Sequence, residues 1–355
     1  MAQEDSFKKT IRSLQQALLT LAGLVSTAVV IVIWGAGLQL GWFSHFTQKT
    51  NMNTEITGRR TPLAADSLWR PPAQSLMNTA QEADLIKYGQ DLIVNTAKYL
   101  GPKGNVVYSS NGMNCQNCHL EAGGKPWGNN YGAVASTFPK YRERSGTVEN
   151  TSKRVNDCFE RSLNGKALDT NSREIKAIVA YLHFVGRDVP KGKTPRGTGI
   201  WHVPYMDRAA DPEKGKLVYQ QKCAYCHGSD GQGVGKAGGT GYVYPPLWGK
   251  NSYNKGAGLY RISRLAGYIK TSMPLGASWD KPQLSDEESW DIAAYINSRP
   301  RPAKDLSRDW PSIAGKPIDH PFGPYTDPFS EKQHKFGPFK PIKQWQDQHT
   351  LARKK

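Results

Sequence analysis

Residues 113–120 read MNCQNCHL, and residues 222–229 read KCAYCHGS. Each stretch contains two cysteines separated by two residues and followed directly by a histidine. This pattern is the attachment signature of c-type haem, in which two thiols bind the macrocycle and the histidine binds the iron. One copy could arise by chance or belong to a zinc site, but a zinc site would need further ligands. Two copies predict two covalently bound haem c groups, attached through Cys115, Cys118, Cys223 and Cys226.

The same helical frame surrounds both motifs. A segment with a glycine inside an apolar helical pattern precedes each motif, at residues 82–96 and 211–222. A second helical segment follows each motif, at residues 172–186 and 285–300, and begins with a serine typical of an N-cap. The glycine allows the later helix to cross the earlier one at close range. Two helices that cross over a haem form the cytochrome c fold, so we expect a mainly α protein with two tandem cytochrome c-like domains.

The N-terminal region contains a long uncharged stretch, ALLTLAGLVSTAVVIVIWGAGLQLGWF, at residues 17–43. Its length is sufficient for a transmembrane helix. Three basic residues precede this stretch, namely Lys8, Lys9 and Arg12, and the next lysine or arginine after it is Lys49. The positive-inside rule therefore predicts that the residues after the stretch are exported. A cleaved signal peptide is the alternative, but the apolar run is long and lacks a small-x-small cleavage site. We expect a single-pass protein of the bacterial inner membrane with its haem domains in the periplasm.

These features divide the chain into seven expected segments: a cytoplasmic N-terminus at 1–16, a transmembrane anchor at 17–43, a tether at 44–81, a first haem domain at 82–186, a linker at 187–210, a second haem domain at 211–302 and a proline-rich basic tail at 303–355. The linker is expected to pack across both domains through Trp201 and Tyr205. The tail has no clear helical period and is expected to wrap the surface.

The composition narrows the possible partners. The 355 residues include 47 Lys and Arg against 30 Asp and Glu, a net charge of +17. Such a charge suits a small anionic substrate, an acidic protein or an anionic membrane. No nucleic-acid-binding motif is present, so we expect no nucleic acid partner.

The second axial ligand of each iron decides its chemistry, because His119 and His227 of the two motifs supply only one ligand each. In the second domain, Met273 lies 46 residues after His227, just before a proline and ahead of the closing helix. A neutral thioether favours ferrous iron and raises the reduction potential. We therefore expect His227 and Met273 to bind the second iron.

The first domain has no methionine between residues 119 and 205, so its second ligand must differ. Cys158 and His183 are the available donors, and His183 is expected to have a surface or packing role. A thiolate from Cys158 would stabilise ferric iron and lower the potential. Cys158 could instead be a buried free thiol or form an intermolecular disulfide, although an odd cysteine in an exported protein calls for a function.

Basic residues gather around Cys158. A spacing of four residues places Arg154, Cys158 and Ser162 on one face of an expected helix. A solvated basic surface is the ordinary interpretation of such a run. An arginine on the same face as an iron-binding sulfur, however, indicates an oxyanion site, because guanidinium groups bind tetrahedral oxyanions in a bidentate manner. Further basic residues lie upstream at Lys140, Arg142 and Arg144.

Four segments carry a resemblance to a known family: residues 111–146 (NGMNCQNCHLEAGGKPWGNNYGAVASTFPKYRERSG), 153–165 (KRVNDCFERSLNG), 244–258 (YPPLWGKNSYNKGAG) and 273–276 (MPLG). Over about residues 82–302 the sequence resembles the dihaem thiosulfate dehydrogenases, which are periplasmic c-type cytochromes. The N-terminal apolar stretch and the tail lie outside this resemblance.

The resemblance implies that the two haems are close enough for direct electron transfer and that the first haem forms the active site. It implies His119 and Cys158 as ligands of the first iron, and His227 and Met273 as ligands of the second. Some members carry a lysine directly before the methionine and exchange ligands with redox state, but Ser272 occupies that position here. The residues implied to hold the sulfonate end of the substrate are Arg144, Arg154 and Ser162.

The implied reaction couples two thiosulfates into tetrathionate and releases two electrons to a soluble cytochrome c or a membrane respiratory complex. Arginines would offset the repulsion between the two dianions, and the net charge of +17 would attract them. Two alternatives remain at this point. The same site could run in reverse as a tetrathionate reductase, or the protein could be a membrane-tethered dihaem electron carrier with no substrate of its own.

Overall fold

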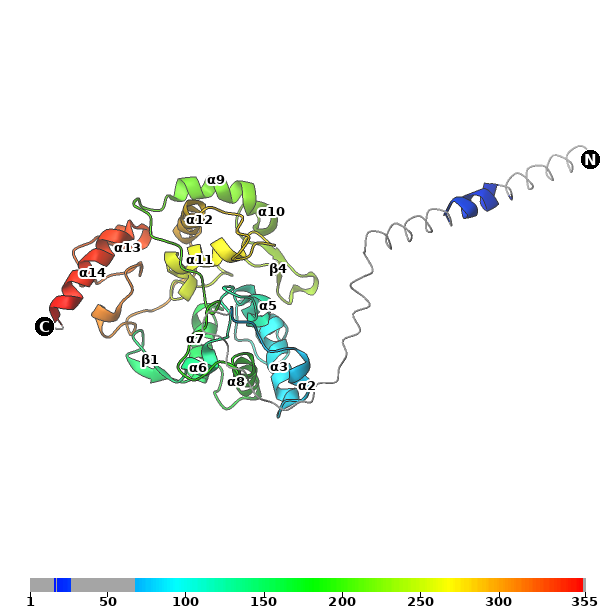
Figure 1. The fold of residues 1–355 in the computed structure, drawn as a ribbon, viewed down its shortest axis with the longest axis horizontal. Coiled ribbons are helices and arrows are strands. Elements are labelled where there is room, and N and C mark those ends of the chain that lie inside the picture. The colour runs from blue at the N-terminus through cyan, green and yellow to red at the C-terminus, as the bar shows by residue number, and fades with distance from the viewer. Residues whose placement is uncertain (1–15, 17, 27–67, 354–355) are drawn as a thin grey trace, which may run out of the picture. The chain divides into compact units, whose positions relative to one another are not determined.

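The computed structural model describes residues 16, 18–26 and 68–353 of the chain (Figure 1). The chain divides into two compact units, Met1–Arg59 and Arg60–Lys355. The expected N-terminal segment 1–16, the anchor 17–43 and most of the tether fall largely outside the described residues. Among the residues that are described, no helix is both long and apolar enough to span a bilayer.

The larger unit is mainly helical, as the sequence predicts. The first domain contains α2 (Ser75–Asn78), α3 (Ala83–Val94), α4 (Thr96–Leu100), η2 (Cys115–Asn117), α5 (Leu120–Gly123), α6 (Val134–Thr137), β1 (Lys140–Arg142), β2 (Thr147–Glu149), α7 (Thr151–Arg161) and α8 (Arg173–Val185). The second domain contains α9 (Pro212–Lys222), α10 (Ala224–His227), β3 (Val234–Gly235), η3 (Ala237–Gly239), β4 (Tyr242–Tyr244), η4 (Gly258–Tyr260), α11 (Ile262–Ser272) and α12 (Asp286–Ser298). The strands form two antiparallel pairs, β1 with β2 and β3 with β4.

The close helix crossing predicted for both domains is confirmed. A Cβ atom added at Gly89 of α3 would lie 2.0 Å from the carbonyl oxygen of Ala177 in α8. A Cβ added at Gly215 of α9 would lie 1.9 Å from the carbonyl oxygen of Asp291 in α12. Both distances are far below van der Waals contact, so only glycine permits these helix pairs to approach as they do.

The predicted N-caps of the closing helices are also present. The Ser172 side chain accepts a hydrogen bond from the amide of Ile175 at the start of α8. Ser285 caps α12 and forms a reciprocal capping box with Glu288. Each cap satisfies amide groups that would otherwise lack partners in the first turn.

The start of the first domain differs from the expected tether at residues 44–81. Trp69 is 1% exposed, and its ring lies against Gly132, where an added Cβ would meet the indole at 2.4 Å. Its amide nitrogen donates to the carbonyl oxygen of Arg196 at 2.7 Å. Residues 68–81 are therefore part of the folded domain. The polar, proline-containing sequence around Trp69 does not indicate that these residues are folded, because a single large buried ring makes no periodic pattern.

The linker packs against both domains, as predicted. Trp201 makes an edge-to-face contact with Trp127 of the first domain at a ring-centroid distance of 5.2 Å. Tyr205 packs against Trp290 of α12 at 6.1 Å and against Phe339 of the tail at 5.6 Å. These rings join the two domains and the tail into one packed body.

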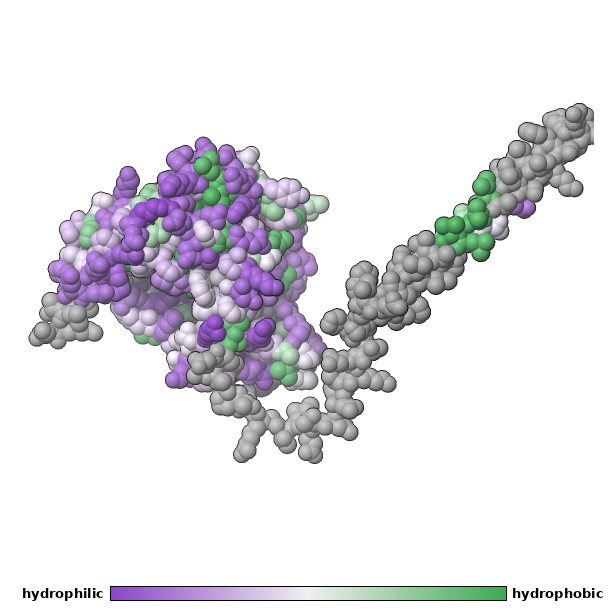
Figure 2. All heavy atoms as spheres, turned by 45° about the horizontal axis from the view of Figure 1, so that its top comes forward, coloured by the Kyte–Doolittle hydropathy of each residue, from purple (hydrophilic) through white to green (hydrophobic). Residues whose placement is uncertain are grey.

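The tail contains ordered structure that the sequence pattern does not reveal: η5 (Ile313–Gly315), α13 (Glu331–Phe336) and α14 (Phe339–Arg353). Phe339 and Ile342 are 3% and 0% exposed, so α14 is held to the body by buried apolar side chains. Figure 1 shows α13 and α14 beside the second domain, away from α3 and α8. The face of the molecule in Figure 2 is largely hydrophilic, and its hydrophobic residues form small separate areas.

We expect Gly89→Ala to lower the free energy of unfolding by about 1–3 kcal/mol, because the new methyl group overlaps the backbone of α8. Helix propensity alone would have the opposite sign and stabilise by about 0.5–1 kcal/mol. Urea unfolding of the haem-loaded protein, followed by far-UV circular dichroism, measures the difference. Gly258→Ala is the matched control, since a Cβ there meets no atom within 4 Å. Equal losses in both variants would contradict the crossing argument.

Candidate functional site

A cavity of about 640 Å³ is lined by residues of both domains and the tail. A smaller cavity of about 180 Å³ shares part of this lining and extends into the first domain. His119 and Cys158 line both cavities. The smaller cavity is otherwise largely apolar, with Ile93, Phe159 and Leu182 among its walls. An apolar slot with nitrogen and sulfur donors suits a flat macrocycle that carries a metal.

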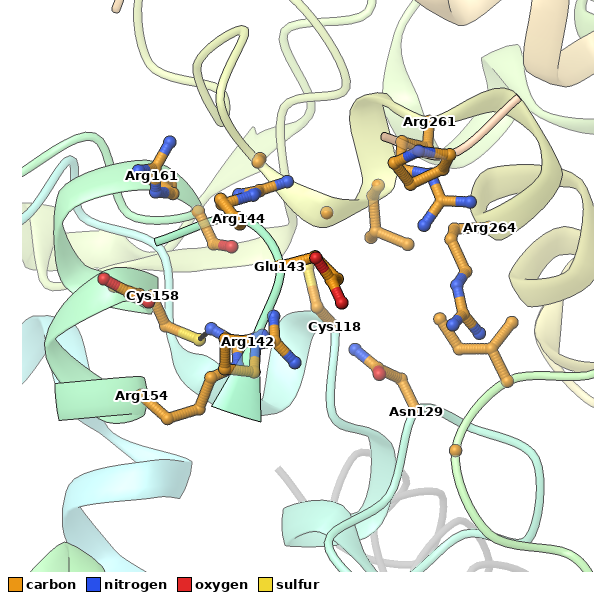
Figure 3. A pocket seen from close by; sticks show the side chains of 18 of the residues that line it. Cys118, Asn129, Arg142, Glu143, Arg144, Arg154, Cys158, Arg161, Arg261 and Arg264 are labelled. Carbon is orange, nitrogen blue, oxygen red and sulfur yellow. Dashed lines mark hydrogen bonds between the residues drawn. The ribbon is translucent and has the colours of Figure 1, made fainter. Parts of the chain in front are cut away.

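The helix α7 carries the three residues that the sequence predicts on one face. Asn150 caps this helix by accepting a hydrogen bond from the amide of Lys153. Arg154 and Cys158 are one helical turn apart, and Nη1 of Arg154 lies 3.1 Å from Sγ of Cys158. Ser162 is the C-cap residue and lines both cavities together with Arg154 and Cys158. The predicted shared face is confirmed, and Figure 3 shows the guanidinium of Arg154 reaching the sulfur of Cys158.

The electrostatics of this contact follow from its geometry. The sulfur of Cys158 is the main cause that raises the pKa of Arg154, ahead of the opposing effect of burial. A guanidinium that donates to sulfur forms a charge-assisted contact, which is stronger than a contact between neutral groups. Arg154 therefore stays protonated although it is withdrawn from solvent.

The first CxxCH motif presents the donors that haem c requires. Cys115 and Cys118 line the smaller cavity, and Nδ1 of His119 hydrogen-bonds to the carbonyl oxygen of Asn129. A carbonyl oxygen can only accept, so Nδ1 carries the proton and Nε2 keeps its lone pair for a metal. Burial lowers the pKa of His119 to about 4, which leaves the ring neutral at pH 7. Two thiols, a neutral imidazole and the further thiol of Cys158 fit a haem c group in this domain.

The second motif has the same arrangement. Cys223 precedes α10, and Cys226 and His227 lie within it. Nδ1 of His227 is 2.9 Å from the carbonyl oxygen of Pro245, which selects the same tautomer as in the first domain. Met273 ends α11 as its C-cap residue and packs, partly buried, against the core. These donors fit a second haem c group.

Positive charge dominates the lining of the large cavity. Its acidic lining residues are Glu143 and Asp157. Its cationic lining residues are Lys140, Arg142, Arg144, Arg154, Arg161, Arg261 and Arg264. Cations gathered in a hollow with protein walls concentrate the positive potential and attract small anions.

The arginines differ in how far their charge is already compensated. Arg161 binds both carboxylate oxygens of Asp309, at 2.9 and 2.8 Å. Arg261 binds Asp319 through two nitrogens, at 2.8 and 2.5 Å. Arg264 has no side-chain hydrogen bond or ion pair with the described part of the chain, and Figure 3 shows it across the cavity from Arg161. The uncompensated charge is therefore available to a bound anion.

Arg142 and Arg144 lie between these extremes. Nε of Arg142 is 3.8 Å from Glu149, and Nη1 of Arg144 donates to the carbonyl oxygen of Gly256 at 2.8 Å. Burial, together with the neighbouring Arg161, lowers the pKa of Arg144 to about 10. Arg144 is still charged at pH 7 and lines the large cavity.

Several lining residues escape prediction from sequence. Arg161 is seven residues after Arg154, on the same helical face, so its position could have been read from the pattern. Arg264 of α11 and Trp310 of the tail reach the cavity only through tertiary packing, and no local signal marks them. His183, the weaker ligand candidate, is exposed and lies 3.3 Å from the hydroxyl of Thr151.

Comparisons with known proteins agree with this architecture. Residues 105–190 match the family model described as SoxA/TsdA, cytochrome c domain, and residues 210–296 match that of cytochrome C oxidase, cbb3-type, subunit III. Both domains are thus cytochrome c domains, and the chain carries covalently bound haem c with iron at the two motifs that fit it.

Relatives and a solved structure point the same way. The thiosulfate dehydrogenase of Stutzerimonas stutzeri is 39% identical over 254 residues, which cover 72% of this chain and 80% of the relative. That of Allochromatium vinosum is 38% identical over 244 residues, which cover 65% of this chain and 86% of the relative. The solved thiosulfate dehydrogenase TsdBA of Marichromatium purpuratum aligns with a TM-score of 0.60 and 30% identity, over 66% of this chain and 50% of the longer solved chain. The chain therefore belongs to the thiosulfate dehydrogenase family of c-type cytochrome enzymes.

Proposed function

We propose that this protein joins two thiosulfates into tetrathionate at the first haem and passes the electrons through the second haem to an acceptor. The balance is two S₂O₃²⁻ giving one S₄O₆²⁻ and two electrons, with formation of one S–S bond. When bound, each haem c supplies an iron that accepts one electron. Two haems therefore match the two electrons that one turnover releases.

One observation carries this proposal: Nη1 of Arg154 lies 3.1 Å from Sγ of Cys158 on the lining of an electropositive cavity. An electron carrier has no need for an arginine beside an iron-binding sulfur. An enzyme that oxidises an anionic sulfur compound needs a cation that holds the oxyanion end while the sulfur end faces the metal. The site therefore supports catalysis better than it supports electron transport alone.

The cavity residues have separate tasks in this proposal. Arg144, Arg154 and Ser162 bind the sulfonate oxygens, because guanidinium and hydroxyl groups donate hydrogen bonds to them. The remaining arginine charge offsets the repulsion between two dianions held in one cavity. Cys158 and His119 would be the residues that hold the iron of the first haem.

Plain His/Met ligation is proposed for the second iron, with His227 and Met273 as ligands. The nearest lysine, Lys270, is occupied elsewhere: its Nζ donates to the carbonyl oxygen of Leu284 at 2.7 Å and pairs with Asp286 at 2.8 Å. A lysine held in this way is a poor candidate to replace Met273. A thioether ligand keeps the potential of the second iron high, which favours electron flow from the first haem.

We propose in addition that residues 17–43 anchor the protein in the bacterial inner membrane, with the haem domains in the periplasm. The uncharged length of this stretch and the basic residues before it support that topology. A soluble cytochrome c or a membrane respiratory complex would then take the electrons.

Two assays test the reaction. Purified protein is mixed with thiosulfate and ferricyanide, and separately with tetrathionate and a reduced dye. Reduction of ferricyanide with formation of tetrathionate is the expected result. Activity only in the second assay would assign a tetrathionate reductase. No activity in either assay, with intact haem spectra, would indicate an electron carrier without a substrate of its own.

Cys158→Ala is expected to abolish thiosulfate oxidation while both haems stay covalently attached, because the CxxCH residues are unchanged. The absorption spectrum of the first haem should change and that of the second should not. Ser152→Ala, on the same helix but outside the cavity lining, is the control and should keep full activity. Full activity in the Cys158 variant would falsify its assignment as a ligand in the active site.

Arg154→Lys keeps the positive charge but removes the planar fork. We expect kcat/KM for thiosulfate to fall about tenfold or more, which corresponds to the loss of a hydrogen bond to a charged group. Arg173→Lys is the matched control, since Arg173 stacks on Tyr88 and does not line the cavity. Equal kinetics in the two variants would show that charge alone suffices.

Met273→Ala is expected to change the potential and spectrum of the second haem and to leave those of the first unchanged. A redox titration that resolves the two haems measures this. Met206→Ala, a partly buried methionine of the linker, serves as the control. A change confined to the first haem would contradict the assignment of Met273 to the second domain's iron.

A further inference from the structure

The tail contributes a wall of the substrate cavity. Trp310, Gly315 and Pro317 line the large cavity, whereas the two matching family models end at residues 190 and 296. The tail is also tied to the segment that carries Arg144, because the amide of Trp310 donates to the carbonyl oxygen of Arg144 at 2.7 Å. A segment outside both matched domains thus lies against a proposed substrate-binding residue.

Asp309, next to Trp310, lies between two arginines of the cavity. Its carboxylate oxygens accept hydrogen bonds from Nη1 and Nη2 of Arg161, at 2.9 and 2.8 Å. Nε of Arg144 lies 3.9 Å from the same carboxylate, whose side chain is 9% exposed. One buried carboxylate therefore fixes Arg161 in a bidentate pair and attracts Arg144 as well.

Arg144 is held from further directions. Its Nη1 donates to the carbonyl oxygen of Gly256 at 2.8 Å, and its guanidinium carbon lies 5.6 Å from the centre of the Trp310 ring. A carboxylate, a carbonyl and an aromatic ring thus surround one guanidinium. Such contacts remove its conformational freedom before any ligand binds.

A carboxylate beside an anion-binding cavity has an electrostatic cost. Asp309 repels a bound dianion, so charge alone predicts that its removal would strengthen anion binding. The compensating benefit is geometric, since without Asp309 the guanidinium groups of Arg144 and Arg161 would repel each other and lose their fixed directions. The two effects have opposite signs, which makes them separable by experiment.

We propose that Asp309 is a positioning residue for the substrate: it orients Arg144 and neutralises Arg161, so that the tail forms an integral part of the oxyanion site. This proposal rests on the proposed function, in which Arg144 binds a sulfonate group. It assigns the tail a role in substrate affinity rather than in surface packing alone.

The test uses the full-length protein with both haems and two variants, Asp309→Asn and Asp309→Glu. Calorimetry measures the Kd of sulfate, a tetrahedral dianion that does not react, and steady-state assays measure KM and kcat for thiosulfate with ferricyanide. We expect Asp309→Asn to raise both the Kd and KM about tenfold while kcat changes much less. Asp309→Glu keeps the charge but displaces the carboxylate by one methylene, so a smaller rise of the same sign is expected.

Asp305→Asn is the matched control, because Asp305 is an exposed carboxylate of the same segment that accepts a hydrogen bond from the amide of Ser307 and does not line the cavity. Unchanged values in this control, together with weakened binding in both Asp309 variants, support the proposal. An unchanged or lower sulfate Kd in the Asp309 variants overturns it, as does equal weakening in the control. A further outcome separates the two proposals. If sulfate binds more weakly to both Asp309 variants than to the wild-type protein and the Asp305 control, but the wild-type protein does not oxidise thiosulfate, the proposed function fails and the positioning role stands.

Discussion

The spacing of four residues between Arg154 and Cys158 on α7 is the constraint on which the site depends. One helical turn brings a guanidinium within 3.1 Å of a sulfur, and the same helix carries Arg161 and Ser162 toward the cavity. Asn150 caps this helix at its N-terminus, so its first turn is fixed against fraying. A polar helix of this kind is held in place by the helices around it, and the close crossing at Gly89 in turn holds α3 against α8.

Charge compensation in the cavity separates structural arginines from those left for a ligand. Two carboxylates of the tail with little exposed side-chain surface, Asp309 and Asp319, each accept two hydrogen bonds from one arginine, Arg161 and Arg261 respectively. Removal of either partner from a buried pair leaves a costly unpaired charge, so these pairs hold the tail to the domains. Arg154 and Arg264 lack carboxylate partners of this kind, and the potential they leave uncompensated attracts anions.

Much of the architecture could be predicted from the sequence because it depends on local patterns. The two CxxCH motifs, the glycines at Gly89 and Gly215 and the serine caps all act within a few residues or through one contact type, and the structure has them where the pattern indicates. Trp69 could not be predicted, since a single buried ring leaves no periodicity. Arg264 and Asp309 reach the cavity only when distant segments pack together, and no residue spacing encodes that. The tail helices α13 and α14 could not be predicted from a helical period, because Gly337 and Pro338 separate them and Pro341 lies within α14.

The aromatic contacts of the linker have a consequence for how this protein can be divided. Trp201 packs on one domain and Tyr205 on the other, while direct hydrogen bonds also cross between the domains, such as that from the Tyr268 hydroxyl to the carbonyl oxygen of Asn117 at 3.0 Å. Separation of the two cytochrome modules would expose these aromatic rings to water and leave the polar groups that bond across the interface without their partners. The pair of modules is thus a single structural unit, in which the packing of the linker and the domains sets the relative position of the two CxxCH motifs.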